Sequence, residues 1–507
     1  MGRATPTTDI LPECLIQKIF SYLSFKEAAK KSILSKTWLH AWLTLPNLEF
    51  TVDYLKDNTK IVDNIMERYR DGKIPIEKFE LSDYSDSIEV FVLIDKWLDI
   101  ALQNGVKDLV YRDFSCSSSY RCPIFTILAA KSLRDLVLWC CNLKLVSFTS
   151  SVANCNSLRK LSLIAVHLDE NMLQTLLSSC PLIVSFILEY CDGLEKIELL
   201  NLQKIKSVSI RTQQNRLVKI QAPTLENLTY SSYSSEEFDV VECQNLKSLD
   251  ISHVTISDGF LQNLISRSQS LKMLKLQYCH GTGDIDSSNL VSLEYMGDQI
   301  PELKIASDSR KLKHSKIVLH CYSLNVAWFC KLRKFLSDST SWSQVSLYVV
   351  SFNEINMKDM RLDDRVPIPQ VDVLDVEIES SRECPMFVDA LLGSCHPRRL
   401  ILTSTNKMIK HFISHFMYMK NLSDSTSYGN KPWHGQLKEV KAYIFDRKNS
   451  SWQVVELRRV KLAIMTLSRS QKVQFPAETK TLGDFFPSVL ALGNRVTWTT
   501  ETLSTFF

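Results

Sequence analysis

The apolar residues of this chain follow one short pattern through much of its length. The pattern is L-x-x-L-x-L, in which polar positions separate the apolar ones, as expected of a short strand that buries one face. Ten copies start at Ile76, Val106, Leu133, Leu158, Ile183, Ile205, Leu225, Leu246, Leu271 and Leu290. Most of the intervals between them fall in or near a period of about 20–29 residues, which predicts a stack of repeats, each built around one strand.

Stretches with helical periodicity lie between some of these strands. In "HLDENMLQTLLSSCP", Met172, Leu173, Leu176 and Leu177 fall on one face, and the Cys-Pro pair after them ends the helix. The same reasoning applies to "TISDGFLQNLISRSQ". The pattern and its period are those of leucine-rich repeats. They predict an irregular α/β solenoid, or horseshoe, whose concave face is lined by strands.

The strict pattern weakens after about residue 310, although strands and helices still alternate. We expect residues 311–460 to form a degenerate α/β region that closes the solenoid, and residues 461–507 to form a divergent tail, either folded or disordered. The expected elements are strands at 344–350, 371–378 and 397–403, helices at about 322–338, 385–395 and 405–420, loops at 355–370 and 422–432, and a last pair of strands starting at Trp433 and Trp452.

Residues 9–50, ahead of the repeats, predict three short helices. Pro12 suits a first helical turn, and Leu15, Ile19 and Leu23 follow it as an apolar stripe, with Ile16 and Phe20 beside them.

A second and a third helix should follow within the same segment. Ser24 and Glu27 form a capping box for a helix that carries Ala28, Ala29, Ile33 and Leu34. Ser35 can cap a third helix with Trp38 and Trp42 on one face, and Pro46 ends the segment. Helices this short are marginal alone, and so small a module buries too little surface to be stable. It therefore needs a partner, either the repeats that follow, which it would cap, or another protein.

The same segment resembles an F-box, the adaptor-binding module of SCF-type (Skp–cullin–F-box) ubiquitin ligases. The resemblance rests on Asp9–Glu13, the stripe of Leu15, Ile19 and Leu23, Ser32–Trp38 with Trp42, and the exit Pro46–Phe50. Cys14 and Thr37 depart from the usual acidic residue and arginine. The whole chain is most similar to plant F-box proteins with leucine-rich repeats, some of which end in an FBD-type segment.

The resemblance implies a non-catalytic receptor subunit without a cofactor. Its F-box would bind a Skp-type adaptor, and through it a cullin, while the concave face holds a protein target for ubiquitination. The implied domains are 9–50 (F-box), 74–310 (leucine-rich repeats), 311–460 (degenerate or FBD-like region) and 461–507 (tail). The expected adaptor contacts, buried in a groove of the partner, are Leu11, Pro12, Leu15, Ile19, Leu23, Leu34 and Trp38.

The charged residues of the chain do not identify the kind of target that it binds. The chain has 60 basic and 56 acidic residues, a balance that favours neither nucleic acid nor a membrane surface. Among residues between the inward leucines there is a modest basic bias, which is either a solvated face or a target-binding face. The candidate target contacts are Arg159, Lys160, Lys247, Asp250, Lys272 and Lys275. Two alternatives stay open: a repeat scaffold without a ligase role, and a small-molecule receptor with a pocket of clustered basic residues.

The remaining motifs favour no enzyme. Cys155, Cys180 and Cys243 each lie three residues before a strand pattern, as a metal ladder or, more simply, as a packed row of small apolar side chains. His411 and His415 share a helix face but lack a third ligand, so no metal site is expected. No signal peptide and no apolar run of about 18 residues is visible, and with 14 cysteines we expect free thiols in a reducing compartment, the nucleus or the cytoplasm.

Overall fold

The computed structural model describes the chain in two compact units, Met1–Gly281 and Thr282–Phe507. The described residues are 11–454 apart from 54–57, 86, 116–119, 144–154, 214–215, 233–237, 257–258, 280–281, 286–288, 306–311, 339–341, 352–367, 380–383, 406, 416–436 and 447–450. The expected tail, and all or most of both expected loops, lie outside the described residues.

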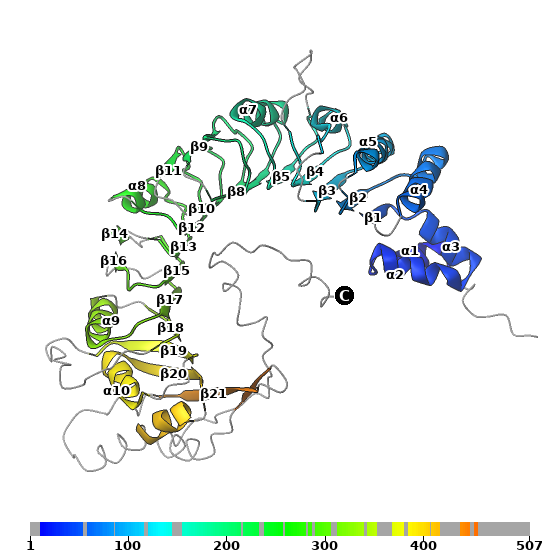
Figure 1. Ribbon diagram of the computed structural model, residues 1–507. Coiled ribbons are helices and arrows are strands. Elements are labelled where there is room, and N and C mark those ends of the chain that lie inside the picture. Colours follow the sequence, from blue (N-terminus) through cyan, green and yellow to red (C-terminus); the bar gives the residue numbers. More distant parts are fainter. Residues whose placement is uncertain are drawn as a thin grey trace, which may run out of the picture. The chain divides into compact units, whose positions relative to one another are not determined.

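Three α-helices open the first unit, as the sequence predicts. They are α1 (Glu13–Phe20), α2 (Phe25–Lys31) and α3 (Lys36–Leu43), with a 3₁₀ turn, η2 (Ser32–Leu34), between the last two (Figure 1). The capping box is confirmed: the Glu27 amide donates to Ser24 Oγ, and Glu27 Oε2 accepts from the Ser24 amide. Ser35 Oγ likewise accepts from the Trp38 amide and caps α3.

The second helix is shorter than predicted. It ends at Lys31, and Ile33 and Leu34 lie on the 3₁₀ turn instead. Ser32 is the reason that the structure offers, because its hydroxyl donates to the Ala29 carbonyl at 2.7 Å. A serine that bonds back to the preceding turn competes with the regular helical hydrogen bonds.

A parallel sheet runs through the rest of the first unit. Its first strand, β1 (Asn47–Val52), starts where the sequence pattern sees only the exit of the helical segment, and it pairs with β2 (Lys78–Asp83). Each further strand pairs in parallel with the one before it. They are β3 (Asp108–Asp113), β4 (Asp135–Trp139), β5 (Lys160–Ile164), β6 (Ser185–Glu189), β8 (Ser207–Thr212), β10 (Asn227–Ser232), β12 (Ser248–Ser252) and β13 (Met273–Gln277). All the strands predicted in this unit are therefore present, each starting just after its first apolar position.

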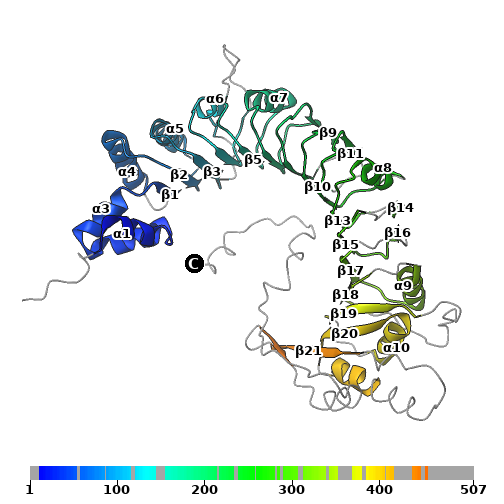
Figure 2. The ribbon, with the colours of Figure 1, turned by 180° about the vertical axis from the view of Figure 1, so that it is seen from behind.

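The length of a repeat decides what backs its strand. Where the structure describes them, the longer repeats carry a helix there, whereas shorter repeats, such as those that start at Ile183, Ile205 and Leu225, carry only a short strand. The helices are α4 (Thr59–Gly72), α5 (Ile88–Gln103), α6 (Ile124–Leu128), α7 (Glu170–Ser179) and α8 (Phe260–Arg267), all on one side of the sheet (Figures 1 and 2). The short strands β7 (Lys196–Leu199), β9 (Leu217–Gln221) and β11 (Phe238–Val241) form a second parallel sheet, which the sequence pattern does not predict.

A left-handed residue follows several strands of the main sheet. Cys140, Ala165 and Tyr190, at equivalent positions of three successive repeats, have φ of 59°, 52° and 56°. The amide of each donates to a carbonyl at the end of the next strand, for example Ala165 to Glu189 at 2.7 Å. The turn out of each strand is thus fixed by the repeat, although none of these residues is a glycine.

The second unit has the same strand stacking. β15 (Ser292–Gly297), β17 (His314–Cys321), β18 (Gln344–Val349), β19 (Gln370–Ile378), β20 (His396–Thr403) and β21 (Glu439–Asp446) pair in parallel, and β22 (Ser451–Val454) is antiparallel to β21. Besides these, β14 (Thr282–Ile285) pairs with β16 (Glu302–Ile305). The helices are α9 (Val326–Asp338), α10 (Pro385–Ser394) and residues 407–415. The predicted alternation of strands and helices, including the last strand pair, is confirmed, and the fold is an α/β leucine-rich-repeat solenoid.

Candidate functional site

The first helix, α1, has two apolar faces. Ile16 and Phe20, one turn apart, are buried among Ala28, Ala41 and other side chains of the helical module. Leu15 and Ile19, also one turn apart but one residue earlier, remain 48% and 37% exposed. The single wide stripe predicted from the sequence is therefore two stripes, one for the internal core and one for the surface.

Other apolar side chains of the module are exposed as well. Leu11 and Pro12 precede α1 and are exposed, as is Leu34. Tyr22, Ile33 and Leu39 were not expected as contacts, yet Tyr22 and Ile33 are 76% and 85% exposed. We call the whole set the helical apolar surface: Leu11, Pro12, Leu15, Ile19, Tyr22, Ile33, Leu34 and Leu39. So many exposed apolar residues in one small module make it a candidate for protein interaction.

Two of the expected adaptor contacts, Leu23 and Trp38, pack in or against the core of the helical module. Trp38 is only 8% exposed, and its ring packs edge to face against Phe20, with the centroids 5.3 Å apart. Leu23 is half-buried and packs on the same core. Both residues join helices to each other rather than project from the surface. The sequence pattern gave no signal for the missed residue Ile33, because it placed Ile33 on a helix, whereas Ile33 and Leu34 lie on the 3₁₀ turn and are both exposed.

The module is packed onto the first repeat. The ring of Phe25 in α2 lies 5.2 Å from that of Phe50 in β1, and Phe50 lies 6.1 Å from Phe79 in β2. The buried hydroxyl of Tyr69 in α4 donates to the Leu45 carbonyl at 2.8 Å. The helical module is therefore a cap on the repeats and also carries a free apolar surface, so the two alternatives from the sequence are compatible.

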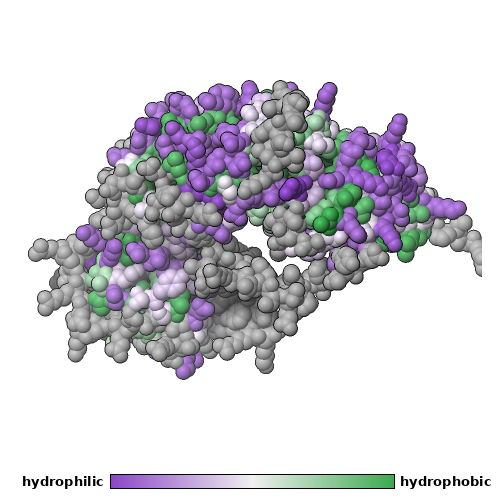
Figure 3. Space-filling model, turned by 45° about the horizontal axis from the view of Figure 1, so that its top comes forward, coloured by the Kyte–Doolittle hydropathy of each residue, from purple (hydrophilic) through white to green (hydrophobic). Residues whose placement is uncertain are grey.

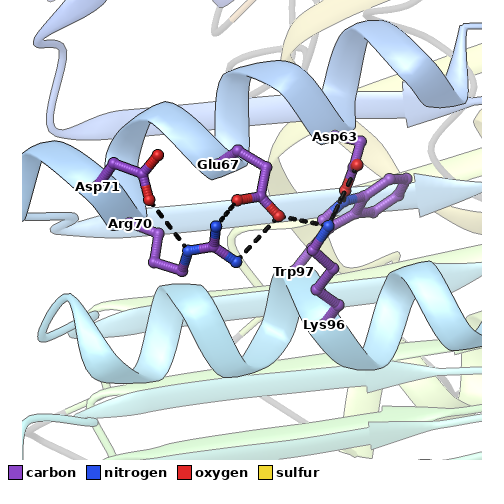
Figure 4. A network of polar contacts seen from close by, with 6 residues as sticks. All are labelled: Asp63, Glu67, Arg70, Asp71, Lys96 and Trp97. Atoms are coloured by element: carbon purple, nitrogen blue, oxygen red, sulfur yellow. Dashed lines mark hydrogen bonds and ion pairs between the residues drawn. The ribbon is translucent and has the colours of Figure 1, made fainter.

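A polar network joins α4 and α5 behind the first strands (Figure 4). Asp63 accepts hydrogen bonds from Lys96 Nζ and from Trp97 Nε1, each at 2.9 Å. Glu67 contacts both Lys96 and Arg70, and Arg70 Nε reaches Asp71 at 3.2 Å. Burial alone would raise the pKa of Asp63, but the hydrogen bonds from Lys96 and Trp97 outweigh it and lower that pKa. These charges hold two helices together, and no catalytic arrangement is evident in them.

The opposite face of the sheet has an apolar centre on β3 to β6. Val110, Val137 and Ile187 share one row of the strand register, and Trp139 pairs directly with Ile164 in another row. The first row also contains Ser162, which is buried like Val110, whereas Val137 and Ile187 are half-buried. We call the five apolar residues the strand-face patch. Phe114, which follows β3, extends the patch, since its ring lies 5.3 Å from that of Trp139. Figure 3, in which the top of Figure 1 comes forward, shows hydrophobic residues scattered among hydrophilic ones on the side of the helices rather than the strand face.

Ion pairs border this patch on both sides. On the side of β2, Arg112 contacts Glu80, and on the side of β8, Arg211 Nε lies 3.6 Å from Glu189 Oε1. Burial alone would raise the pKa of Glu80, but hydrogen bonds from Lys78 and Arg112 lower it. An apolar centre with a polar rim is the usual composition of a protein-binding surface.

Comparison with known protein families identifies both the helical module and the repeats. Residues 9–50 match the F-box domain family, residues 65–244 match the family described as At1g61320/AtMIF1, LRR domain, and residues 245–268 match Leucine Rich Repeat. The chain carries an F-box and leucine-rich repeats.

Similar plant proteins include several with both of these parts in their names. F-box/LRR-repeat protein At3g03360 of Arabidopsis thaliana is 26% identical over 325 residues, which are 61% of this chain and 66% of the relative. Putative F-box/LRR-repeat protein At5g02930 of the same plant is 29% identical over 230 residues, 44% of this chain and 45% of the relative. The chain thus spans between about half and two thirds of the length of such relatives.

The charged residues predicted to bind the target do not form one cluster. Arg159 and Lys160 belong to the β5 repeat, whereas the others lie around β12 and β13, four and five strands away, which is about 19–24 Å. Within the second group Lys247 Nζ lies 2.7 Å from Glu226, and Lys275 Nζ lies 4.0 Å from Asp250. Lys272 is exposed. Charges paired within the chain are poorly available to a ligand, so the basic pocket that a small-molecule receptor would need is not seen among the described residues.

The cysteines of the repeats are packed side chains. Cys155, Cys180 and Cys243 are buried, as the simpler of the two interpretations predicts. Among the described residues, no group of three histidine, cysteine or acidic side chains could hold a metal ion. His415 Nδ1 lies 2.6 Å from Asp389. None of the helices in the described part of the chain has the length and apolar character needed to cross a membrane.

Proposed function

We propose that the chain is the substrate-recognition subunit of an SCF-type ubiquitin ligase. Its F-box binds a Skp-type adaptor and thereby a cullin, and the strand-lined face of its repeats binds a protein target. One observation carries this proposal above all: the core of the F-box is filled from within, by Ile16, Phe20 and Trp38 among others, while its outer apolar residues stay exposed in the described part of this chain.

The helical apolar surface fits a groove on a partner. Leu15 and Ile19 lie one turn apart on the outer face of α1, the spacing with which a helix inserts side chains into an apolar groove. Of the contacts expected from the sequence, Leu11, Pro12, Leu15, Ile19 and Leu34 fit this role. Tyr22, Ile33 and Leu39 join them, and Leu23 and Trp38 support them from the core.

The repeats supply the second binding surface. The strand-face patch around Trp139 offers an uncharged centre for a target, with Arg159 and Lys160 nearby on the β5 repeat. Lys247, Asp250, Lys272 and Lys275 remain predicted contacts at the far end of the same sheet. The chain then acts by holding a target near the ubiquitin-transferring subunits, so its contribution to catalysis is proximity.

Co-purification with a plant Skp-type adaptor tests this function. The double variant Leu11→Asp, Leu15→Asp should lose binding, because a charge placed in an apolar groove costs several kcal/mol. Ile88→Asp is the matched control, since Ile88 is an exposed apolar residue of α5 outside the F-box. Circular dichroism of each variant shows whether the repeats stay folded.

The results separate the alternatives. Binding that is lost only in the double variant, with cullin recovered alongside the wild-type chain, supports the receptor. Adaptor binding without cullin would favour a scaffold that binds proteins without a ligase role. If the wild-type chain does not bind the adaptor, the proposal is wrong and the helical module serves only as a cap.

A further inference from the structure

Two buried thiols occupy equivalent positions in neighbouring repeats. Cys155 precedes β5 and Cys180 precedes β6, and their separation along the chain equals the register offset of the two strands, in which Lys160 pairs with Ser185. The alignment extends back to the thiols, because the Cys155 amide donates to the Ser179 carbonyl at 2.8 Å. Neighbouring strands lie about 4.8 Å apart, within the range of about 4.4–6.8 Å that the Cα atoms of a disulfide require.

The two thiols lie near enough to affect each other's protonation. The Cys155 thiolate would accept a hydrogen bond from the Cys180 thiol, with the amide of Leu158 and the Ser157 side chain, 3.8 Å away, as further donors. Although burial opposes them, these donors lower the pKa of Cys155 to about 6, and the same interaction raises the pKa of Cys180. At neutral pH this arrangement provides a thiolate beside a protonated thiol.

We propose that Cys155 and Cys180 form a reversible oxidation site for a small hydroperoxide. The Cys155 thiolate attacks one peroxide oxygen, an S–O bond forms, the O–O bond breaks, and hydroxide or alkoxide leaves. The Cys180 sulfur then attacks the resulting sulfenic acid, an S–S bond forms, the S–O bond breaks, and the oxygen leaves as water with the thiol proton. The two thiols lose two electrons, and the peroxide gains them. The small size of the oxidant matters, since each cysteine is only 2% exposed.

A second thiol pair in the same unit lacks these features. Cys122 and Cys141 also lie near each other, but the pairing of Arg121 with Asn142 places Cys122 beside Leu143, so the two cysteines are not in register. The hydrogen bond with Cys122, together with burial, holds the pKa of Cys141 well above its usual value. Cys141 thus stays protonated, which predicts that oxidation is selective for the Cys155–Cys180 pair.

The disulfide would enclose α7 and link the repeats of β5 and β6, which carry Ile164 and Ile187 of the strand-face patch. It would thereby fix the spacing of two strands on that surface. The inference uses only the described thiols and holds whether or not the chain binds an adaptor.

The test is peroxide oxidation of the full-length reduced chain, followed by mass spectrometry of peptides under non-reducing conditions. We expect a link between the tryptic peptide that contains Cys155 and the peptide of residues 161–196, which contains Cys180 and Cys191. Cys180→Ser should abolish the link, and Cys191→Ser should leave it intact. In a series between about pH 5 and pH 9, the rate should reach half its maximum near pH 6, the pKa of Cys155, whereas an ordinary thiol titrates near pH 8.5.

Exposed Cys14 shows in the same samples that the peroxide is active. If Cys14 is oxidised and no Cys155–Cys180 link forms, the proposal fails. It also fails if the link forms equally fast in denaturant, because the folded register would then play no part. A half-maximal rate near pH 8.5 would contradict the proposal that Cys155 is ionised at neutral pH beside a protonated Cys180.

Discussion

The indole N–H of Trp97 donates to the carboxylate of Asp63 at 2.9 Å, and this bond joins α5 to α4. Trp97 is completely buried, so no water can replace the acceptor without a rearrangement. The salt bridge from Lys96 to the same carboxylate lies at the surface of the two helices. Of the two interactions, we expect the buried one to matter more for stability, because exposed ion pairs contribute little.

Replacement of Asp63 tests this relationship. Asp63→Ala should lower the free energy of unfolding by about 1–3 kcal/mol, the cost of leaving a buried donor without its acceptor. Urea unfolding followed by tryptophan fluorescence measures the change. Asp71→Ala removes a carboxylate from the same network but from an exposed position, and no measurable loss is expected there. Equal effects of the two variants would contradict the importance of the buried bond.

The same carboxylate should make stability depend on pH. Hydrogen bonds lower the pKa of Asp63 in the folded state, so its charge stabilises the fold above the unfolded pKa of about 3.9. That contribution disappears as the pH falls through the folded pKa. The difference in free energy of unfolding between the wild-type chain and Asp63→Asn should therefore be largest near neutrality and shrink below about pH 4. A difference that grows in acid would mean that the sign of the pKa shift is wrong.

Leu15 and its neighbour Ile16 should separate binding from folding. Ile16→Ala removes a core side chain and should destabilise the F-box by about 2–5 kcal/mol. Leu15→Ala, in the preceding position, should leave the thermal midpoint nearly unchanged and weaken adaptor binding. Thermal denaturation and a pull-down with the adaptor measure the two effects. If Leu15→Ala unfolds the module, the outer stripe belongs to the core.

Ala165 tests the left-handed turn after the strands. With φ of 52°, a β-branched side chain is strained there, and Ala165→Val should cost about 1–3 kcal/mol. Ala165→Gly relieves the strain but makes the unfolded chain freer, so its net effect should stay within about 1 kcal/mol. Denaturant unfolding compares the two. A valine variant as stable as the wild type would show that the repeat turn tolerates another backbone conformation.

The strand-face patch can be tested apart from the F-box. Trp139→Ala with Ile164→Asp should reduce the proteins that proximity labelling recovers in plant cells, and adaptor binding should be kept. Replacement of Lys247, Lys272 and Lys275 by alanine serves as the comparison. If the lysine variant loses targets and the patch variant does not, the target-binding surface lies on β12 and β13 instead of the strand-face patch.

Sequence periodicity predicted the strands because burial of the leucine positions is a local and repeated requirement, as Leu136, Leu161 and Phe186 illustrate. The caps at Ser24 and Ser35 were predictable for the same reason, since each depends on a few neighbouring residues. The orientation of Trp38 was not, because the sequence gives the same apolar signal for a core and for a surface. The short second sheet escaped prediction because β7, β9 and β11 are very short strands that are stabilised by one another.

The end of α3 at Leu43 and the start of β1 at Asn47 are almost adjacent in the chain, and Phe25, Phe50 and Tyr69 pack across this junction. The F-box therefore cannot swing on a linker relative to the first repeat. A target held on the sheet of this unit would be presented to the adaptor from one fixed direction. The choice of lysines that receive ubiquitin would then depend on how the target is oriented as much as on whether it binds.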